Sequence, residues 1–169
     1  MPGSGKEEFL NVAKEKGYDI VRMGDVVRDL SRKNDIPMTD SGVGTFAHNE
    51  REKHHYGIWA DRTLSRIEEE NTIIDGVRNL EEVEIFKAQL GEEMQIVAVH
   101  VSPGTRFQRL KDRNREDAPK TWEEFQKRDE RELDWGLGRL IAKADVMLIN
   151  EGTLSEFHDD VEEFLGSMS

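Results

Sequence analysis

The chain has no cysteine among its 169 residues. Disulfide bonds, thiolate metal sites and a cysteine nucleophile are therefore excluded. It also has no apolar run long enough to span a bilayer, and we expect no secretory leader. These absences favour a cytoplasmic protein with no membrane partner.

Positive charge is scarce as well. The chain carries 24 Lys and Arg residues against 36 Asp and Glu residues, so its net charge is −12. The electric field of a protein with this net charge repels nucleic acid and anionic membrane surfaces, so nucleic acid is disfavoured as a partner. It would repel a nucleotide too, unless cations gather locally, so the position of each arginine matters. Charge gives no indication of the oligomeric state.

A glycine-rich stretch opens the chain and leads into an amphipathic run that predicts a helix over residues 5–16. Glycines around a serine, followed by a lysine, let successive backbone N–H groups turn inward around a polyphosphate while the lysine reaches the β and γ oxygens. The sequence therefore predicts a phosphate-binding loop. Its residues are Pro2, Gly3, Ser4, Gly5, Lys6 and Glu7.

The loop departs from the full pattern in two ways. The first glycine of that pattern, and the buried strand that feeds it, would fall upstream of Met1, so we expect the first strand of the fold to be absent from this sequence. Glu7 also occupies the position of the Ser or Thr whose hydroxyl normally binds Mg²⁺. A carboxylate can bind Mg²⁺, but it adds a negative charge beside the phosphates. The alternative is a glycine-rich turn that only caps a helix.

Four short strands are predicted, over residues 18–23, 72–75, 95–101 and 144–150, and helices alternate with them. Alternation of strands and helices is typical of a parallel sheet with right-handed crossovers. Counting the absent first strand, we expect an α/β domain with a parallel five-stranded sheet and helices on both faces. A single domain over residues 1–169 fits this length.

Polar residues follow two of these strands. Asp25 and Arg28 come just after the first visible strand, where Asp25 can cap a helix that runs to about residue 33. Asp75 ends the strand over residues 72–75, where open α/β sheets bind ligands, and it can hold the water shell of Mg²⁺. The alternative for both aspartates is a plain capping role. Residues 39–44 read as a flexible stretch before a polar helix over residues 46–55 that carries Arg51.

A local cluster of positive charge, which an acidic protein needs in order to bind a nucleotide, lies further along the chain. Arg109 and Arg113 are four residues apart, so they share one face of a helix that starts near Thr105. Residues 114–119 form a polar break before a second helix over residues 121–135. Such a hairpin, over residues 105–135, can close as a lid on a polyphosphate. The alternative is a solvated hairpin with internal ion pairs. The basic residues of the first helix are Arg106, Arg109, Lys111, Arg113 and Arg115.

Three segments together resemble one family. The loop over residues 2–6, the segment over residues 24–28 and Asp75-Gly76-Val77-Arg78 are similar to the phosphate loop, acceptor helix and Asp-Gly-x-x-Arg segment of adenylate-kinase-like nucleotide kinases. The last strand and its loop, residues 144–154, resemble the end of dephospho-coenzyme A kinases. The whole chain is most similar to an archaeal group of such proteins labelled UPF0200. Its shared residues include Arg128-Asp129-x-x-Glu132-Leu133-x-x-Gly136-x-Gly138.

The resemblance implies a three-layer P-loop fold of the nucleotide kinase type, with ATP and Mg²⁺ as cofactors. The donor would bind residues 2–7, and Asn150 would lie in the loop against its base. The resemblance gives the remaining roles as follows: Lys6, Arg78, Arg109 and Arg113 in catalysis, Asp25, Arg28, Arg51 and Arg78 in acceptor binding within a helical region over about residues 25–70, and Glu7 and Asp75 at the metal.

Two functions remain open at this point. The first is ATP-dependent phosphoryl transfer to a small phosphorylated acceptor, a nucleoside monophosphate or a dephospho-coenzyme A-like molecule. The arginines around a second anion pocket favour it. The second is a nucleotide-binding regulator or slow ATPase without an acceptor, which Glu7 favours. Phosphoryl transfer needs positioning and charge neutralisation more than a nucleophilic side chain, which suits a chain without cysteine.

Overall fold

The computed structural model describes residues 1–113 and 118–168. The chain forms two compact units. The first unit combines residues 1–18 with residues 95–169, and the second unit is the continuous segment over residues 19–94.

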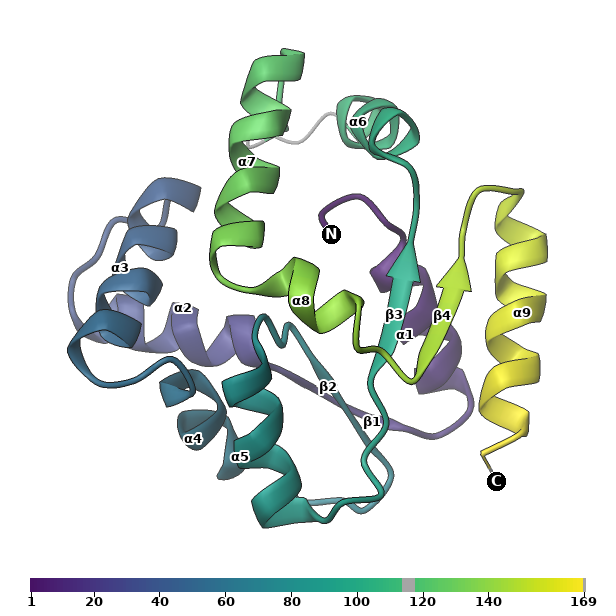
Figure 1. Cartoon of the computed structure of the whole chain (residues 1–169), viewed down its shortest axis with the longest axis horizontal. Coiled ribbons are helices and arrows are strands. Elements are labelled where there is room, and N and C mark those ends of the chain that lie inside the picture. The colour runs from purple at the N-terminus through teal and green to yellow at the C-terminus, as the bar shows by residue number, and fades with distance from the viewer. Residues whose placement is uncertain (114–117, 169) are drawn as a thin grey trace. The chain divides into compact units, whose positions relative to one another are not determined.

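The first unit is built on a pair of parallel strands. β3 (Val97–His100) pairs with β4 (Val146–Ile149), with Val97 opposite Val146 and His100 opposite Ile149, and both strands point the same way in Figure 1. Helices α1 (Lys6–Glu15) and α9 (Leu154–Gly166) pack against each other, with Phe9 and Phe164 6.3 Å apart between ring centroids. Both strands therefore end at the same edge of the unit.

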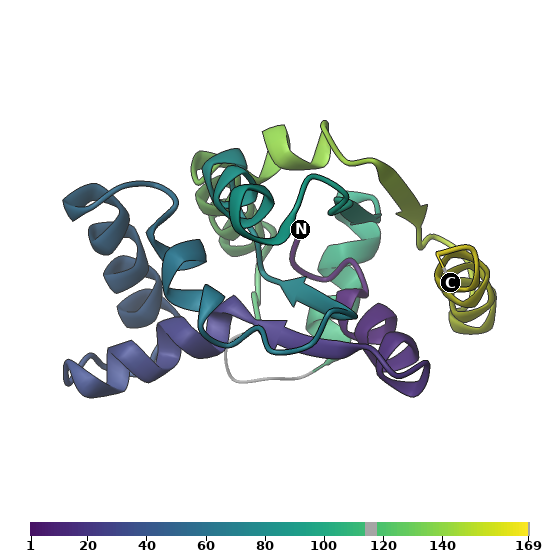
Figure 2. The ribbon, with the colours of Figure 1, turned by 90° about the horizontal axis from the view of Figure 1, so that it is seen from below.

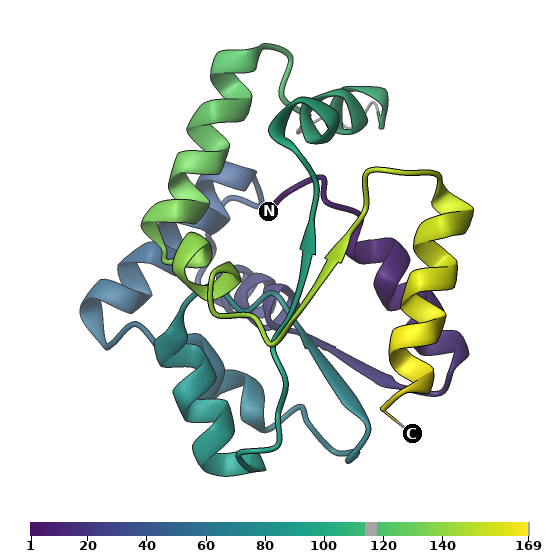
Figure 3. The ribbon, with the colours of Figure 1, turned by 45° about the vertical axis from the view of Figure 1, so that its right-hand side comes forward.

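Between β3 and β4, the described residues of the first unit form three helices. They are α6 (Pro103–Asp112), α7 (Trp122–Asp134) and the short α8 (Leu137–Ile141), and Figure 3 shows α6 beyond the tip of β3. The rings of Phe107, Trp122 and Phe125 lie within 5.0–5.5 Å of one another between α6 and α7. This cluster, in which Phe125 is fully buried, packs the two helices together.

The second unit has its own pair of parallel strands. β1 (Asp19–Arg22) pairs with β2 (Thr72–Asp75), as Figure 2 shows, and Arg22 lies opposite Asp75. Trp59 and Phe86 are fully buried at the centre of its core. Its helices are α2 (Met23–Lys33), α3 (Asp40–Lys53), α4 (Ile58–Leu64) and α5 (Leu80–Leu90).

The predicted α/β class with parallel strands and alternating helices is confirmed. All four visible strands lie within their predicted ranges, although each is only four residues long. The strands in the described residues pair two by two, and most of their side chains are half-buried. The prediction of a single domain over residues 1–169 stays a prediction.

Two local predictions were wrong. Residues 39–44 are the start of α3 and not a flexible stretch, because Thr39 caps that helix by accepting a hydrogen bond from the Gly42 N–H at 3.0 Å. Asp25 does not cap α2, because the helix already begins at Met23 and Asp25 lies within its first turn. Arg115 and most of the predicted polar break at 114–119 lie outside the described residues.

Candidate functional site

The predicted phosphate loop has the backbone shape that its glycines suggest. Gly3 and Gly5 adopt left-handed conformations, with φ of 82° and 93°, and α1 begins directly after Gly5. The Gly5 carbonyl accepts the Glu8 N–H at 2.9 Å, which closes the first turn. The loop therefore leads directly to the N-terminus of α1, where backbone N–H groups and the helix dipole favour the binding of an anion.

Asn150 lies directly behind this loop. Its side-chain Nδ2 donates a hydrogen bond to the Ser4 carbonyl at 3.0 Å, and both residues are buried. A Cβ atom added at Gly5 would lie 2.1 Å from Nδ2 of Asn150, so no larger residue fits there without a shift. The structure therefore brings Asn150, predicted to lie at the donor, to the backbone of the predicted donor loop.

Lys6 and Glu7 occupy the first turn of α1. Lys6 is exposed, as a side chain that follows a transferred phosphate must be, and Glu7 is half-buried beside it in the chain. A carboxylate oxygen is a ligand type that Mg²⁺ accepts, so Glu7 fits a metal-holding role chemically. No cluster of three or more His, Asp or Glu side chains able to hold a metal occurs within residues 1–113 and 118–168.

Glu151, next to Asn150, is a further candidate for the site that was not predicted from the sequence. It accepts hydrogen bonds from the Ser102 N–H and, at 3.0 Å, from Oγ1 of Thr105, so it joins the end of β4 to the start of α6. The Ser102 hydrogen bond, with a smaller contribution from the charge of Arg109, holds the pKa of Glu151 below its usual range. Glu151 lies within residues 144–154, the segment that resembles the end of dephospho-coenzyme A kinases, so this resemblance was the signal that could have identified it.

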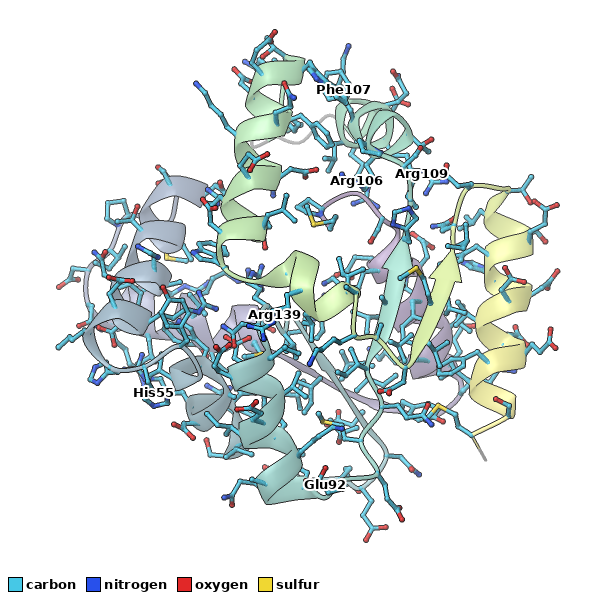
Figure 4. The ribbon with its side chains drawn as sticks, viewed as in Figure 1. His55, Glu92, Arg106, Phe107, Arg109 and Arg139 are labelled. Atoms are coloured by element: carbon cyan, nitrogen blue, oxygen red, sulfur yellow. The ribbon has the colours of Figure 1, made fainter. Side chains whose placement is uncertain are left out.

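The two predicted lid arginines lie at the end of the first unit that carries the loop. Arg109 is half-buried on α6, while Arg113 is the exposed residue that caps the C-terminus of this helix. Figure 4 labels Arg106 and Arg109 on α6. The helices at 103–112 and 122–134 occupy the segment predicted as a lid, and the lid role stays a prediction.

In the second unit, Asp75 is the last residue of β2, and Arg78 lies in the loop that follows the strand. Asp75 is buried at the end of the strand, and Gly76 turns the chain with φ of 97°. Arg78 is half-buried and donates from Nη1 to the Gly76 carbonyl at 2.6 Å. This arrangement fixes a carboxylate and a guanidinium three residues apart on one short loop.

Arg51 reaches the same loop from α3. It forms a buried ion pair with Glu82, with 2.9 Å between Nη2 and Oε1, and only 4% of Arg51 is exposed. The other oxygen of Glu82 accepts the backbone N–H of Arg78 at 2.7 Å. Glu82 thus brings Arg51 and Arg78 together, and a buried Arg51 holds the Arg78 loop in place from behind.

Asp25 and Arg28 lie on the exposed side of α2 and bind each other, with 2.5 Å between Oδ1 and Nη2. The helical region of this unit also holds an open hollow of about 370 Å³ between the α2–α3 connection and α3. Its lining is mostly apolar and carries no charged side chain. The hollow is formed by Ile36, Pro37, Ser41, Gly42, Thr45, Phe46 and Asn49.

Comparison with known proteins identifies the family. A family model described as an AAA domain matches residues 1–126. The chain is 43% identical over 159 residues to the UPF0200 protein Ta0179 of Thermoplasma acidophilum, across 94% of this chain and 87% of that relative. It is 42% identical over 172 residues to a UPF0200 protein of Hyperthermus butylicus, across 100% and 91%.

The chain belongs to the UPF0200 family. A further UPF0200 protein, MK0400 of Methanopyrus kandleri, is 44% identical over 171 residues, across 94% of this chain and 82% of the relative. Together with the AAA-domain match, UPF0200 membership confirms the predicted P-loop kinase-like fold and indicates nucleotide binding. Within the described part of this UPF0200 chain, every helix is too short or too polar to cross a bilayer.

Proposed function

We propose that this protein transfers the terminal phosphoryl group of ATP to a small phosphorylated acceptor, a nucleoside monophosphate or a dephospho-coenzyme A-like molecule. The observation that supports the proposal is that two separate loops carry groups suited to an anion. One is the glycine loop before Lys6, and the other is the Asp75–Arg78 segment, where the Arg78 N–H donates to Glu82, which is itself paired with Arg51. An enzyme that only hydrolysed ATP would need no second anion pocket.

In the proposed reaction, an acceptor oxygen bonds to the terminal phosphorus of ATP as the bond from that phosphorus to the oxygen of ADP breaks. Lys6 and Arg109 would neutralise the charge on the transferred group, and Arg113 would assist from the end of α6. One well-placed arginine can contribute roughly 10³ to 10⁵ in rate. Mg²⁺, where bound, would neutralise donor charge, with Glu7 and Asp75 as its carboxylates.

On the acceptor side, Arg78 would bind the acceptor phosphate, and Asp25 and Arg28 would help to hold the acceptor. Arg51 would support Arg78, since it is buried against Glu82. The neutral hollow over α3 is of a size that suits an uncharged organic part of an acceptor, since ligand pockets begin at about 300 Å³.

The test is a screen of nucleoside monophosphates and dephospho-coenzyme A with ATP and Mg²⁺, read by mass spectrometry of the products. We expect one acceptor to gain a phosphoryl group and the Lys6→Met variant to lose at least about 100-fold in rate, because one donor to the developing charge is worth that much. Absence of a phosphorylated product from every acceptor would overturn the kinase proposal.

The second candidate is a slow ATPase or nucleotide-dependent regulator. Glu7 favours it, because a half-buried carboxylate would lie beside the donor phosphates at the position of the Ser or Thr hydroxyl in the full loop pattern. Phosphate release from ATP at a rate that no acceptor changes would support this candidate. A Glu7→Ser variant that gained acceptor phosphorylation would show that the wild-type protein is limited by metal handling.

A further inference from the structure

Arg106 of α6 is buried within the first unit, with 3% of its surface exposed. Its Nε donates to the Val101 carbonyl at 3.2 Å, and its Nη1 donates to the Pro2 carbonyl at 3.1 Å. Asp129 of α7 accepts from both terminal nitrogens, at 2.8 and 2.5 Å. The guanidinium also lies 4.9 Å from the ring centre of Phe125.

One side chain therefore joins three segments of the first unit: the end of β3, the phosphate loop and α7. A guanidinium is planar and presents its N–H groups in a fixed fork, so it can hold these partners only when all three are in place. A buried charge is costly unless it is paired and hydrogen-bonded. The burial of Arg106 among these partners therefore indicates a structural role, the joining of the three segments, that an arginine on the surface would not have.

We propose that Arg106 and Asp129 form a positioning pair that holds the phosphate loop in its donor-binding shape and couples this shape to the docking of α7. The proposal rests on the proposed donor site at residues 2–7. Arg106 acts through the Pro2 carbonyl, whereas Arg109 and Lys6 would touch the donor itself. It assigns a role to Asp129, which the resemblance to UPF0200 proteins left without one.

An electrostatic role and a positioning role of Asp129 predict opposite effects on ATP affinity when its negative charge is removed. Asp129 shares Nη1 of Arg106 with the Pro2 carbonyl, so its carboxylate lies close to the predicted anion site. Removal of a negative charge there would strengthen ATP binding if charge alone mattered. If the pair positions the loop, the same removal weakens binding, because Arg106 loses the partner that orients it.

The experiment is titration calorimetry of MgATP into the wild type, Asp129→Asn, Arg106→Lys and Lys111→Gln at one fixed salt concentration. We expect Asp129→Asn and Arg106→Lys to weaken binding by about fivefold or more, the size of a typical coupling between sites. Lys111→Gln is the matched control, because it removes a positive charge from an exposed position on the same helix. It should change binding by about twofold at most. Unchanged or tighter binding by Asp129→Asn would overturn the proposal.

Hydrogen exchange without nucleotide provides a second readout that does not depend on the proposed function. We expect faster amide exchange at residues 3–6 and in α7 for Asp129→Asn, in protein whose melting curve shows that it is folded. Unchanged exchange at residues 3–6 would overturn the positioning role even if ATP binding fell. If the wild type bound no ATP at all, the proposed function would fail, and the exchange measurement would still decide the role of the pair.

Discussion

Gly5 and Asn150 approach so closely that the size of residue 5 can be tested directly. At Gly5, a new Cβ atom would lie 2.1 Å from Nδ2 of Asn150, whereas at Gly17, which has a similar φ of 89°, no atom lies within 4 Å. An alanine in the left-handed region costs about 1–2 kcal/mol by itself. We expect Gly17→Ala to show only this cost in urea unfolding, and Gly5→Ala to lose at least about 1 kcal/mol more.

A second substitution separates the steric clash from backbone strain. Asn150→Ser shortens the side chain that Gly5 faces, so the additional cost of Gly5→Ala should shrink in the Asn150→Ser background. The remaining cost should approach that of Gly17→Ala. Equal costs for Gly5→Ala in both backgrounds would show that the close approach does not limit residue 5.

Helices α3 and α4 are connected by an ion pair whose strength depends on pH. Arg62 of α4 donates to Oε2 of Glu50 at 2.5 Å, and this hydrogen bond holds the pKa of Glu50 below its ordinary value of 4.5. A carboxylate whose pKa is lowered on folding stabilises the protein above its unfolded pKa, and this contribution is lost as the pH falls through the folded pKa. We expect Glu50→Gln to cost about 1 kcal/mol at pH 7.

Urea unfolding of both proteins from pH 7 down to pH 3 checks this prediction. The stability difference should narrow below about pH 4.5 as wild-type Glu50 takes up its proton. Glu162→Gln is the comparison, because Glu162 forms an exposed ion pair with Lys16 and its lowered pKa likewise has a side-chain hydrogen bond as its main cause. The loss of unfolding free energy in Glu162→Gln should be smaller than the loss in Glu50→Gln. Equal losses would mean that the ion pair between α3 and α4 stabilises the protein no more than a surface pair does.

Local patterns were sufficient to predict most elements. The strand predicted over residues 72–75 is present with those bounds, and the helix predicted over residues 5–16 differs from α1 by one residue at each end. Thr39 was misread because its capping hydrogen bond is formed only when Gly42 follows in a helical turn. The five-residue helix α8 was missed because a segment this short has no full apolar period to detect.

Buried charge could not be predicted from the sequence. Arg106 and Arg109 lie in the same basic run, and nothing in the run distinguishes the buried residue from the half-buried one. The difference arises from Asp129, which is 23 residues away along the chain, and from the Val101 and Pro2 carbonyls. Arg51 is a similar case, because its partner Glu82 is 31 residues away. Contacts of this range depend on the completed fold.

The excess of acidic residues affects the stability of the entire chain. With a net charge of −12, like charges repel one another more in the folded state than in the expanded one, and salt screens this repulsion. We expect the melting temperature to rise between 10 and 150 mM NaCl by roughly 2–4 °C, which corresponds to about 1 kcal/mol for a chain of this size.

The exposed run Glu68-Glu69-Glu70 provides the control for this salt effect. Its replacement by three glutamines changes the net charge from −12 to −9, because three negative charges are removed. The salt-dependent rise should be smaller in that variant. A melting temperature that fell with added salt in the wild type would mean that screened ion pairs matter more than the net charge.

Trp122 has a practical consequence that follows from its packing. Trp122 is the first residue of α7, and 39% of its surface is exposed. Its indole ring contacts the ring of Phe107 on α6, with 5.4 Å between the two centroids. Any separation of the two helices would move this indole into water and shift its fluorescence to longer wavelength. The protein thus contains a native optical reporter, and with Trp59 and Trp135 replaced by Phe its emission would follow the hairpin in real time during stopped-flow mixing with nucleotide.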